Sequence, residues 1–107
     1  MTISLEDLKD WMFEVPPGWH QLVQKLVQDI IATNPSDELV ILQIKEKFGG
    51  LRFYVGVASD EVFNLIDIAE QESYKICQDC GTRKEVTTCG SAWFRTVCST
   101  FKEKYPS

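Results

Sequence analysis

The sequence predicts an α+β fold in which amphipathic helices pack on a small antiparallel β-hairpin or sheet, followed by a C-terminal cysteine module that resembles a zinc ribbon. Three observations support this prediction. Apolar residues recur at 3-4 spacing in residues 18–33 and again after residue 59, which is typical of helices with one buried face. Residues 39–58 are rich in β-branched and aromatic side chains that alternate around a glycine pair, as in a hairpin. All the cysteines lie after residue 76.

The N-terminal third is predicted to hold a short helix and a longer one. Ser4 and Asp7 have the spacing of a capping pair at the start of a helix. Pro16-Pro17-Gly18 ends this helix, because proline cannot continue a helix and disfavours helical angles in the residue before it. The apolar stripe of the second helix, in residues 18–33, consists of Trp19, Leu22, Val23, Leu26, Val27, Ile30 and Ile31.

The middle of the chain predicts a hairpin and then a third helix. We expect Gly49-Gly50 to form the turn, because glycine adopts positive φ angles without steric cost. One face of the first strand would carry Val40, Leu42, Ile44 and Glu46, and the other Ile41, Gln43 and Lys45. Ser59 or Asp60 is expected to cap the third helix. Its buried stripe would consist of Val62, Phe63, Ile66, Ala69 and Ser73.

Length and composition indicate how the chain is organised. With 107 residues, 44% of them hydrophobic and 25% charged, it has an ordinary globular composition and enough length for one core. We therefore expect a single domain, residues 1–107, in which residues 1–76 form the helix–hairpin–helix core and residues 77–107 a cysteine-rich subdomain. No apolar run approaches the roughly 20 residues that cross a bilayer, so no membrane contact is expected. The acidic, polar N-terminus differs from a secretory signal, which predicts a cytoplasmic protein.

Charge is unevenly distributed along this acidic chain, whose formal net charge is −5. Residues 39–58 hold three bases and one acid, whereas the third helix carries a run of acids without a base. Both stretches are candidate surfaces for a protein partner, and ordinary solvated faces are the simpler alternative. The candidate partner-binding residues are Asp60, Glu61, Asp67, Glu70 and Glu72 on the helix, and Lys45, Lys47 and Arg52 on the hairpin. The net charge argues against general binding of duplex nucleic acid but allows a local basic patch.

The cysteines form the one constellation with metal chemistry. They are Cys77, Cys80, Cys89 and Cys98, with the spacing C-x2-C-x8-C-x8-C. Four thiolates match the tetrahedral set that a structural Zn²⁺ ion takes, with no position left for a substrate. A zinc ribbon would have a second C-x2-C pair, but Phe101 stands three residues after Cys98. The alternatives are three cysteines completed by His20 or another group, or free thiols that pack as small apolar side chains.

Residue types that carry catalysis are scarce. His20 is the only histidine, which excludes sites built on a pair of histidines. The sequence has no G-x-S-x-G motif, no Walker loop and no G-x-G-x-x-G motif. A thioredoxin-like C-x-x-C pair opens a helix, whereas the pair here follows a predicted helix, so a redox role is disfavoured. We therefore expect neither enzymatic activity nor a small-molecule substrate.

Three stretches carry a resemblance to known proteins. They are Gly18-Trp19 with Leu22-Val23, the segment QIKEKFGGLRFY from Gln43 to Tyr54, and Cys77-x-x-Cys80-Gly81 with Trp93-x-x-Thr96-x-Cys98. In this order they resemble a widespread set of small bacterial and phage proteins that has no established activity. Proteins of that set often have a further Cys or His three residues after the last cysteine, where this chain has Phe101. The resemblance implies a bacterial host cell and transfers no catalytic residue.

Two functions follow from these observations. The first is a non-enzymatic protein-binding module with a structural Zn²⁺ site. Small acidic phage proteins without catalytic motifs often bind and block a host protein, so the resemblance implies an anti-CRISPR-like inhibitor of a host protein or defence complex. The alternative is a nucleic-acid-binding regulator that uses the basic hairpin and the cysteine-rich segment. Its contact residues would be Lys45, Lys47, Arg52, Arg83, Lys84 and Arg95.

Overall fold

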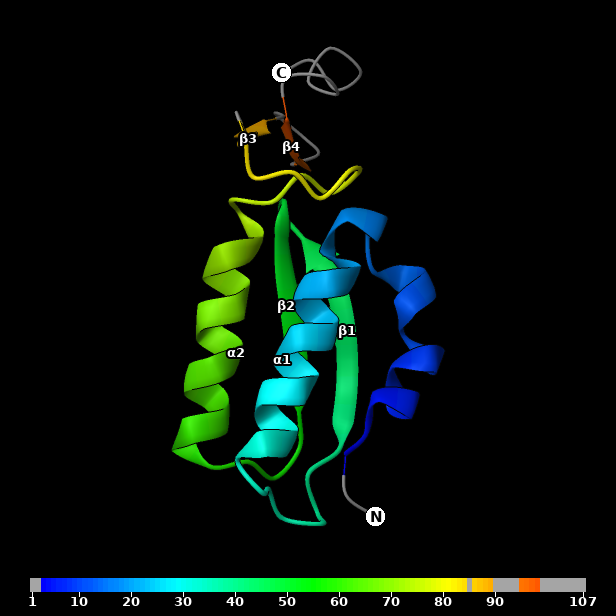
Figure 1. Ribbon diagram of the computed structural model, residues 1–107, viewed down its shortest axis with the longest axis vertical. Coiled ribbons are helices and arrows are strands. Elements are labelled where there is room, and N and C mark those ends of the chain that lie inside the picture. The colour runs from blue at the N-terminus through cyan, green and yellow to red at the C-terminus, as the bar shows by residue number, and fades with distance from the viewer. Residues whose placement is uncertain (1–2, 85, 90–94, 99–107) are drawn as a thin grey trace.

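The structure is a computed structural model that describes residues 3–84, 86–89 and 95–98, apart from the side chains of Phe13, Cys89 and Arg95. Helices packed with two small antiparallel sheets confirm the predicted α+β class. The elements are α1 (His20–Ala32), β1 (Ile41–Lys47), β2 (Gly50–Val55), α2 (Asp60–Ser73), β3 (Val86–Cys89) and β4 (Arg95–Cys98), and short 3-10 helices at Leu5–Asp10, Met12–Glu14 and Pro17–Trp19 precede α1. Helices α1 and α2 lie side by side over the β1–β2 hairpin, and the β3–β4 sheet lies at one end (Figure 1).

The predicted first helix is 3-10 helical rather than α-helical. The predicted capping pair forms, because the backbone N–H of Ser4 donates to Oδ2 of Asp7 at 2.9 Å. Leu8 and Val15 bury their side chains in the core. Val15, the residue before Pro16, is extended, as the residue before a proline prefers, and the segment ends there.

Helices α1 and α2 bury one stripe each, as predicted, except that Ile31 of the predicted stripe on α1 is 37% exposed. The buried residues are Val23, Leu26, Val27 and Ile30 on α1, and Val62, Ile66, Ala69 and Ser73 on α2. Ser59 is the N-cap of α2, and its Oγ accepts from the N–H of Val62 at 3.3 Å. The sequence places Phe63 in this stripe, but its side chain is 50% exposed, because each helical residue turns about 100° from the one before it. No helix in the described part of the chain is long and apolar enough to cross a membrane.

Strands β1 and β2 form the predicted hairpin, but the turn lies one residue earlier than predicted. Lys47 pairs with Gly50, so the turn residues are Phe48 and Gly49. Their φ angles are 54° and 82°, both positive, as a two-residue type I′ turn requires. Gly50 is the first residue of β2 and packs against Tyr74, whose ring and hydroxyl a Cβ at this position would overlap.

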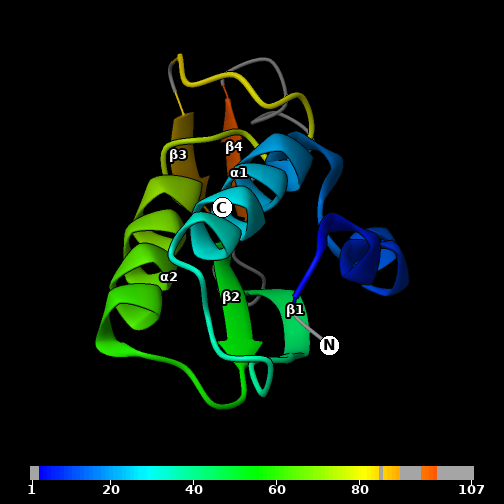
Figure 2. The same ribbon diagram turned by 60° about the horizontal axis from the view of Figure 1, so that its bottom comes forward.

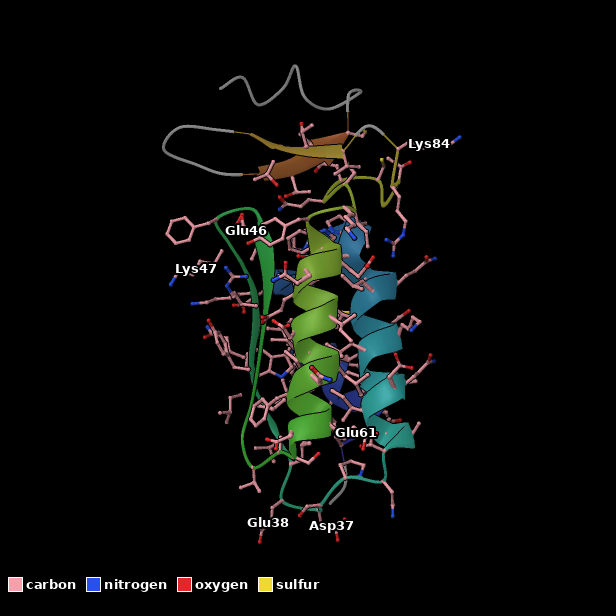
Figure 3. The ribbon with its side chains drawn as sticks, turned by 90° about the vertical axis from the view of Figure 1, so that its left-hand side faces the viewer. Asp37, Glu38, Glu46, Lys47, Glu61 and Lys84 are labelled. Atoms are coloured by element: carbon pink, nitrogen blue, oxygen red, sulfur yellow. The ribbon has the colours of Figure 1, made fainter. Side chains whose placement is uncertain are left out.

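A β-bulge between Ile41 and Gln43 corrects the predicted strand faces. Ile44 and Phe53 are register partners and both are buried against the helices. Leu42 is predicted to share the face of Ile44, but it is 56% exposed. The extra residue of the bulge breaks the simple alternation of faces, so a pattern with a period of two fails across it. The other face of the hairpin carries no helix in the described part of the chain (Figure 3).

Helix α2 also covers the free edge of β2. Oγ of Ser73 accepts a hydrogen bond from the N–H of Leu51 at 2.9 Å, and Oε2 of Glu70 accepts one from the N–H of Phe53 at 3.0 Å. These bonds satisfy backbone donors that an edge strand would otherwise leave unpaired. The helix therefore fixes the hairpin both through the core and through its edge.

Candidate metal centre

Residues 77–82 form a tight loop soon after α2. The N–H of Cys77 donates to the carbonyl of Thr82 at 2.9 Å, and the N–H of Gly81 donates to the carbonyl of Cys77 at 3.0 Å. Gly81 has a φ of 80°, which side chains other than hydrogen rarely allow. The loop explains why glycine follows the C-x2-C pair, and it turns both cysteines toward one point.

Strand β4 brings the third cysteine to this loop. The N–H of Gln78 donates to the carbonyl of Thr96 at 2.8 Å, and the N–H of Thr96 donates to Oε1 of Gln78 at 2.6 Å. Cys98 follows two residues later, and its Sγ lies 3.7 Å from Sγ of Cys80. The Sγ atoms of Cys77, Cys80 and Cys98 all lie within 4.8 Å of one another.

The spacing of these three thiols fits a metal ion. Zn–S bonds of about 2.3 Å at tetrahedral angles place two sulfur atoms about 3.8 Å apart. The distance of 3.7 Å between Cys80 and Cys98 matches this value and exceeds by far the roughly 2.05 Å of a disulfide. Cys77 and Cys98 are buried, whereas Cys80 is exposed, and none of the three forms a disulfide within the described residues. They form a set of soft ligands that can hold a metal ion.

The thiol of Cys80 favours its neutral form when no metal is bound. The backbone N–H of Thr82 lowers the pKa of Cys80. Desolvation and the neighbouring thiols of Cys77 and Cys98 raise this pKa by more, so the net pKa lies above its ordinary value. A metal ion must therefore displace a proton from this thiol when it binds.

The start of α1 anchors the cysteine loop to the core. The N–H of Gly18 donates to the carbonyl of Gln78 at 2.7 Å. Nε1 of Trp19 donates to the carbonyl of Ile76 at 2.9 Å. A Cβ on Gly18 would overlap the carbonyl oxygen of Cys77, so only glycine permits this close approach. The Gly18-Trp19 motif therefore fixes the position of the loop.

Two buried polar residues outside the predicted set of functional residues, Gln78 and Thr96, connect the cysteine loop to β4 and to the hairpin turn. Thr96 is fully buried, and its Oγ1 donates to the carbonyl of Gly49 at 2.5 Å and lies 2.7 Å from Oγ1 of Thr88. Gln78 is also fully buried and holds Thr96 through the two bonds described above. The sequence feature that could have indicated them is their position, because Gln78 lies between Cys77 and Cys80 and Thr96 lies two residues before Cys98. The start of α1, the hairpin turn and the cysteine loop thus meet at one end of the molecule.

The other two predicted ligands have different outcomes. The side chain of Cys89 lies outside the described residues. Its backbone ends β3 and pairs with Arg95, whereas Cys98 pairs with Val86 at the other end of the same ladder. His20 lies elsewhere, with Nε2 at 3.1 Å from the carbonyl of Met12 and 2.9 Å from that of Val15. It is not part of the group of close ligand atoms that the described residues form.

The acids predicted as a partner surface are partly engaged within the fold. Glu70 accepts the hydrogen bond from Phe53 at the edge of β2. Glu72 forms ion pairs with Arg83 at 2.6 Å and with Lys75 at 3.7 Å. The hydrogen bond from Arg83, together with the charge of Lys75, holds the pKa of Glu72 below its usual value. These two carboxylates are therefore occupied by structural contacts.

The remaining predicted acids lie along α2 toward its start. Asp60 and Glu61 occupy the first turn of the helix, where their negative charges interact favourably with the positive end of the helix dipole. Asp67 is exposed in the middle of the helix. Glu61 lies near Asp37 and Glu38 at the end of the molecule that is farther from the cysteines (Figure 3). The structure thus places Asp60 and Glu61 at the opposite end of α2 from Glu70 and Glu72, with Asp67 between the two pairs.

The predicted basic residues divide into two groups. The first group lies on the outer face of the hairpin and consists of Lys45, Lys47 and Arg52. The second follows the cysteine loop, where Arg83 pairs with Glu72 and Lys84 is exposed. Lys47 and Lys84 point to opposite sides of the molecule (Figure 3). The side chain of Arg95 lies outside the described residues.

Comparison with known proteins adds no relative to this description. No protein-family model, no curated protein and no solved structure matches the chain. The function proposed below is therefore argued from the geometry of the chain itself.

Proposed function

We propose that this chain is a non-enzymatic binding protein that docks a partner protein on the outer face of the β1–β2 hairpin, with a structural Zn²⁺ ion at the adjoining end. One observation carries the proposal. The outer face of the hairpin, which no helix covers in the described part of the chain, places Lys45 directly opposite Arg52, next to exposed apolar and aromatic side chains.

The cations of this face repel one another. Lys45 and Arg52 are register partners, and Lys47 lies two residues along the same face of β1. Like charges directly opposite each other destabilise a sheet by up to about 1 kcal/mol. The ion pairs among the described residues are Lys25–Asp29, Lys75–Glu72 and Arg83–Glu72, and none of them includes a hairpin lysine. A partner that brings carboxylates to this face would relieve the repulsion.

Arg52 is held in place for such a contact. Its Nη1 donates to the carbonyl of Leu51 at 2.9 Å, and its Nη2 donates to the hydroxyl of Tyr74 at 3.4 Å. The hydrogen bond to Tyr74 raises the pKa of Arg52 further above its already high value, so the guanidinium stays charged. Ordering this side chain in advance lowers the entropy lost when a carboxylate binds.

Exposed apolar side chains lie beside the cations. Leu42, in the bulge, is 56% exposed, and Tyr54 is 41% exposed. Phe48, in the turn, is 61% exposed, and Nζ of Lys47 lies 5.6 Å from the centre of its ring. A bulky residue with positive φ is unfavourable, and such positions cluster at functional sites. Apolar and aromatic groups next to cations are typical of protein-binding surfaces.

The zinc ion would hold this surface in position. Thiolates prefer Zn²⁺ to the hard ions Mg²⁺ and Ca²⁺, and a reducing cytoplasm keeps the cysteines available. Cys98 lies on β4, whose Thr96 hydrogen-bonds the hairpin turn at Gly49. An ion between Cys77, Cys80 and Cys98 would therefore fix β4 and, through it, the end of the hairpin.

Site-specific crosslinking tests the proposal. A photo-crosslinking amino acid in place of Tyr54 should capture a discrete protein in cells, and the same group in place of the exposed Gln24 on α1 should not. The charge reversal Lys45→Glu should abolish the adduct, whereas Lys25→Glu on α1 should preserve it. Equal capture from both positions, or capture that survives Lys45→Glu, would contradict docking on the hairpin.

A salt titration tests the alternative of nucleic-acid binding, which would use the same cations and Tyr54. Affinity for a labelled oligonucleotide would then fall as the salt concentration rises, and Lys45→Gln would make the slope of log affinity against log salt about one unit shallower. This result, together with no crosslink to protein, would replace a protein partner by a nucleic acid.

The narrower role of a phage-encoded inhibitor of a host protein or defence complex rests on the sequence resemblance and on the absence of catalytic motifs. It requires that the captured protein belong to a bacterial host and lose activity in the cytoplasm when this chain is expressed. Activity that persists at saturating amounts of the wild-type chain would rule this role out.

A further inference from the structure

We infer that the metal centre takes three ligands from the described residues, Cys77, Cys80 and Cys98, and leaves its fourth coordination position to an external thiolate. The inference rests on the proposed binding of Zn²⁺ and concerns the occupant of its fourth position. A site that accepts a ligand from outside differs from the closed four-cysteine site that the sequence predicts.

The β3–β4 ladder places Cys89 too far from Cys98 for both to bind one ion. Val86 lies opposite Cys98, and Cys89 lies three residues farther along, opposite Arg95. A strand rises about 3.3 Å per residue, so the backbone of Cys89 lies about 10 Å along the strand from the position opposite Cys98. Two sulfur atoms on one zinc ion lie only about 4 Å apart. Because each cysteine side chain spans two bonds from Cα to Sγ, the pair cannot bridge this separation while the β3–β4 ladder stays intact.

Among the described residues, no histidine or carboxylate lies close enough to the three thiols to be a fourth ligand. Nε2 of His20 lies within 3.1 Å of two backbone carbonyls, away from the cysteines. In the described ranges, the group of close ligand atoms contains the three cysteines and no histidine or carboxylate. Cys77 and Cys98 are buried and Cys80 is exposed, so the centre is closed toward the core and reaches solvent at Cys80.

A thiolate is the ligand that suits this position. Three thiolates form a soft ligand set, and zinc with three cysteines is commonly completed by a fourth sulfur or by an imidazole. Binding would be a ligand exchange without redox change. The incoming thiol loses its proton to solvent, its sulfur forms a bond to zinc, and the water molecule that it displaces is released. The thiol is a small molecule from solution, because Cys89 is then the one cysteine of the chain that is not a ligand, and we expect no role for it.

Cobalt substitution tests the inference, because Co²⁺ in a thiolate site reports the number of sulfur ligands in its absorption spectrum. The chain is loaded with Co²⁺ under anaerobic conditions with a phosphine reductant that contains no thiol. The variant Cys89→Ser should keep the affinity and spectrum of the parent chain. The variant Cys98→Ser should weaken Co²⁺ binding at least about tenfold.

Adding 2-mercaptoethanol to the loaded parent and to loaded Cys89→Ser should increase the thiolate-to-cobalt absorption of both by the same amount, because a fourth sulfur then binds the ion.

The outcomes separate the inference from the proposed function. Loss of binding in Cys89→Ser equal to that in Cys98→Ser, or a parent spectrum that 2-mercaptoethanol leaves unchanged, would overturn the open position while leaving the zinc site intact. Failure of the parent chain to bind Co²⁺ or Zn²⁺ at all would overturn both the open position and the proposed zinc site. Sedimentation and native mass spectrometry of the loaded chain identify the source of the fourth sulfur. A monomer that carries a thiol adduct supports a small thiol. A metal-dependent dimer would overturn the inference, because the fourth sulfur would then come from a second copy of the chain.

Discussion

The indole Nε1 of Trp19 donates a hydrogen bond to the carbonyl oxygen of Ile76 at 2.9 Å, and both residues are buried. The bond joins the start of α1 to the residue directly before Cys77. The neighbouring bond from Gly18 to the carbonyl of Gln78 adds a second attachment on the other side of Cys77. The cysteine loop is thus held to the core by its backbone, so the core and the metal centre should lose stability together.

Removing the indole donor should destabilise the whole chain. In Trp19→Phe the carbonyl of Ile76 loses its partner while remaining buried, which lowers the free energy of unfolding by about 1–3 kcal/mol. Urea denaturation of the metal-loaded chain measures the change. Trp11→Phe is the matched control, because Trp11 is only partly buried and packs at the margin of the core. A loss as large in the control would mean that ring volume, not the bond, sets the effect.

A methyl group at Gly18 should detach the cysteine loop. Its Cβ would overlap the carbonyl of Cys77 and the backbone of Gln78, neither of which can rotate away. We expect Gly18→Ala to lower both the melting temperature and the affinity for Zn²⁺. In Gly56→Ala the new Cβ would lie 3.2 Å from Cγ2 of Val40, whose side chain is 49% exposed and can shift toward solvent, so this control should change either quantity little. Unchanged Zn²⁺ affinity in Gly18→Ala would show that the loop folds independently of α1.

The helices and the cysteine loop are predictable because their signals are local. The stripe of Val23, Leu26, Val27 and Ile30 repeats with the period of a helix, so α1 follows from spacing alone. The glycine after the C-x2-C pair likewise marks a turn within six residues. Helices packed on a hairpin, with clustered cysteines at one end, are a consequence of these signals and of the need to bury each apolar stripe.

The details that escape the sequence depend on distant contacts. The bulge between Ile41 and Gln43 shifts the register, and no residue type marks it. The turn at Phe48 contradicts the preference for small residues at positive φ, while Gly50 is small because Tyr74 covers it. The hydrogen bond from Thr96 to Gly49 joins residues 47 positions apart in the chain, so no local sequence pattern can predict it.

The two glutamates near the end of α2 should respond differently to substitution. Glu70→Ala removes the acceptor for the N–H of Phe53 at the edge of β2, and we expect a loss of about 1.5–3 kcal/mol, typical of a hydrogen bond to a charged group. Glu72→Ala removes two ion pairs that are largely exposed, which contribute at most about 1 kcal/mol. Chemical denaturation of both variants at pH 7 tests this order. The reverse order would show that α2 does not protect the strand edge.

Relief of the opposed cations should stabilise the chain while weakening its proposed binding. Lys45→Gln removes one of two like charges that face each other across the hairpin, so the free energy of unfolding should rise by about 0.2–1 kcal/mol. Lys25→Gln instead breaks an ion pair with Asp29 at 2.9 Å and should lower it slightly. Thermal melting at low and high salt tests whether both effects are electrostatic, because screening by salt should bring the melting temperatures of Lys45→Gln and Lys25→Gln closer to that of the parent. A decrease for Lys45→Gln at low salt would contradict the repulsion.

The effect of metal on stability should grow as the pH rises. Without metal, the pKa of Cys80 lies above its ordinary value of 9.0, so the neutral thiol stabilises the folded state, and this contribution is lost only above pH 9 and stays nearly constant from pH 5.5 to pH 8.5. With metal, the cysteines bind as thiolates, and protons compete with the ion increasingly as the pH falls. The difference in melting temperature between the Zn²⁺-loaded chain and the chelator-treated chain should therefore be small near pH 5.5 and widen toward pH 8.5.

The variant Cys80→Ser supplies the control for this pH dependence. It removes the thiol with the raised pKa and one of the three ligands, so Zn²⁺ should raise its melting temperature much less than that of the parent at any pH. Chelator treatment should leave the variant nearly unchanged. Competition with a chromophoric chelator at each pH measures the affinity directly, and its slope against pH counts the protons that the ion displaces. An affinity that is flat from pH 6 to pH 8 would mean that these thiols are not the ligands.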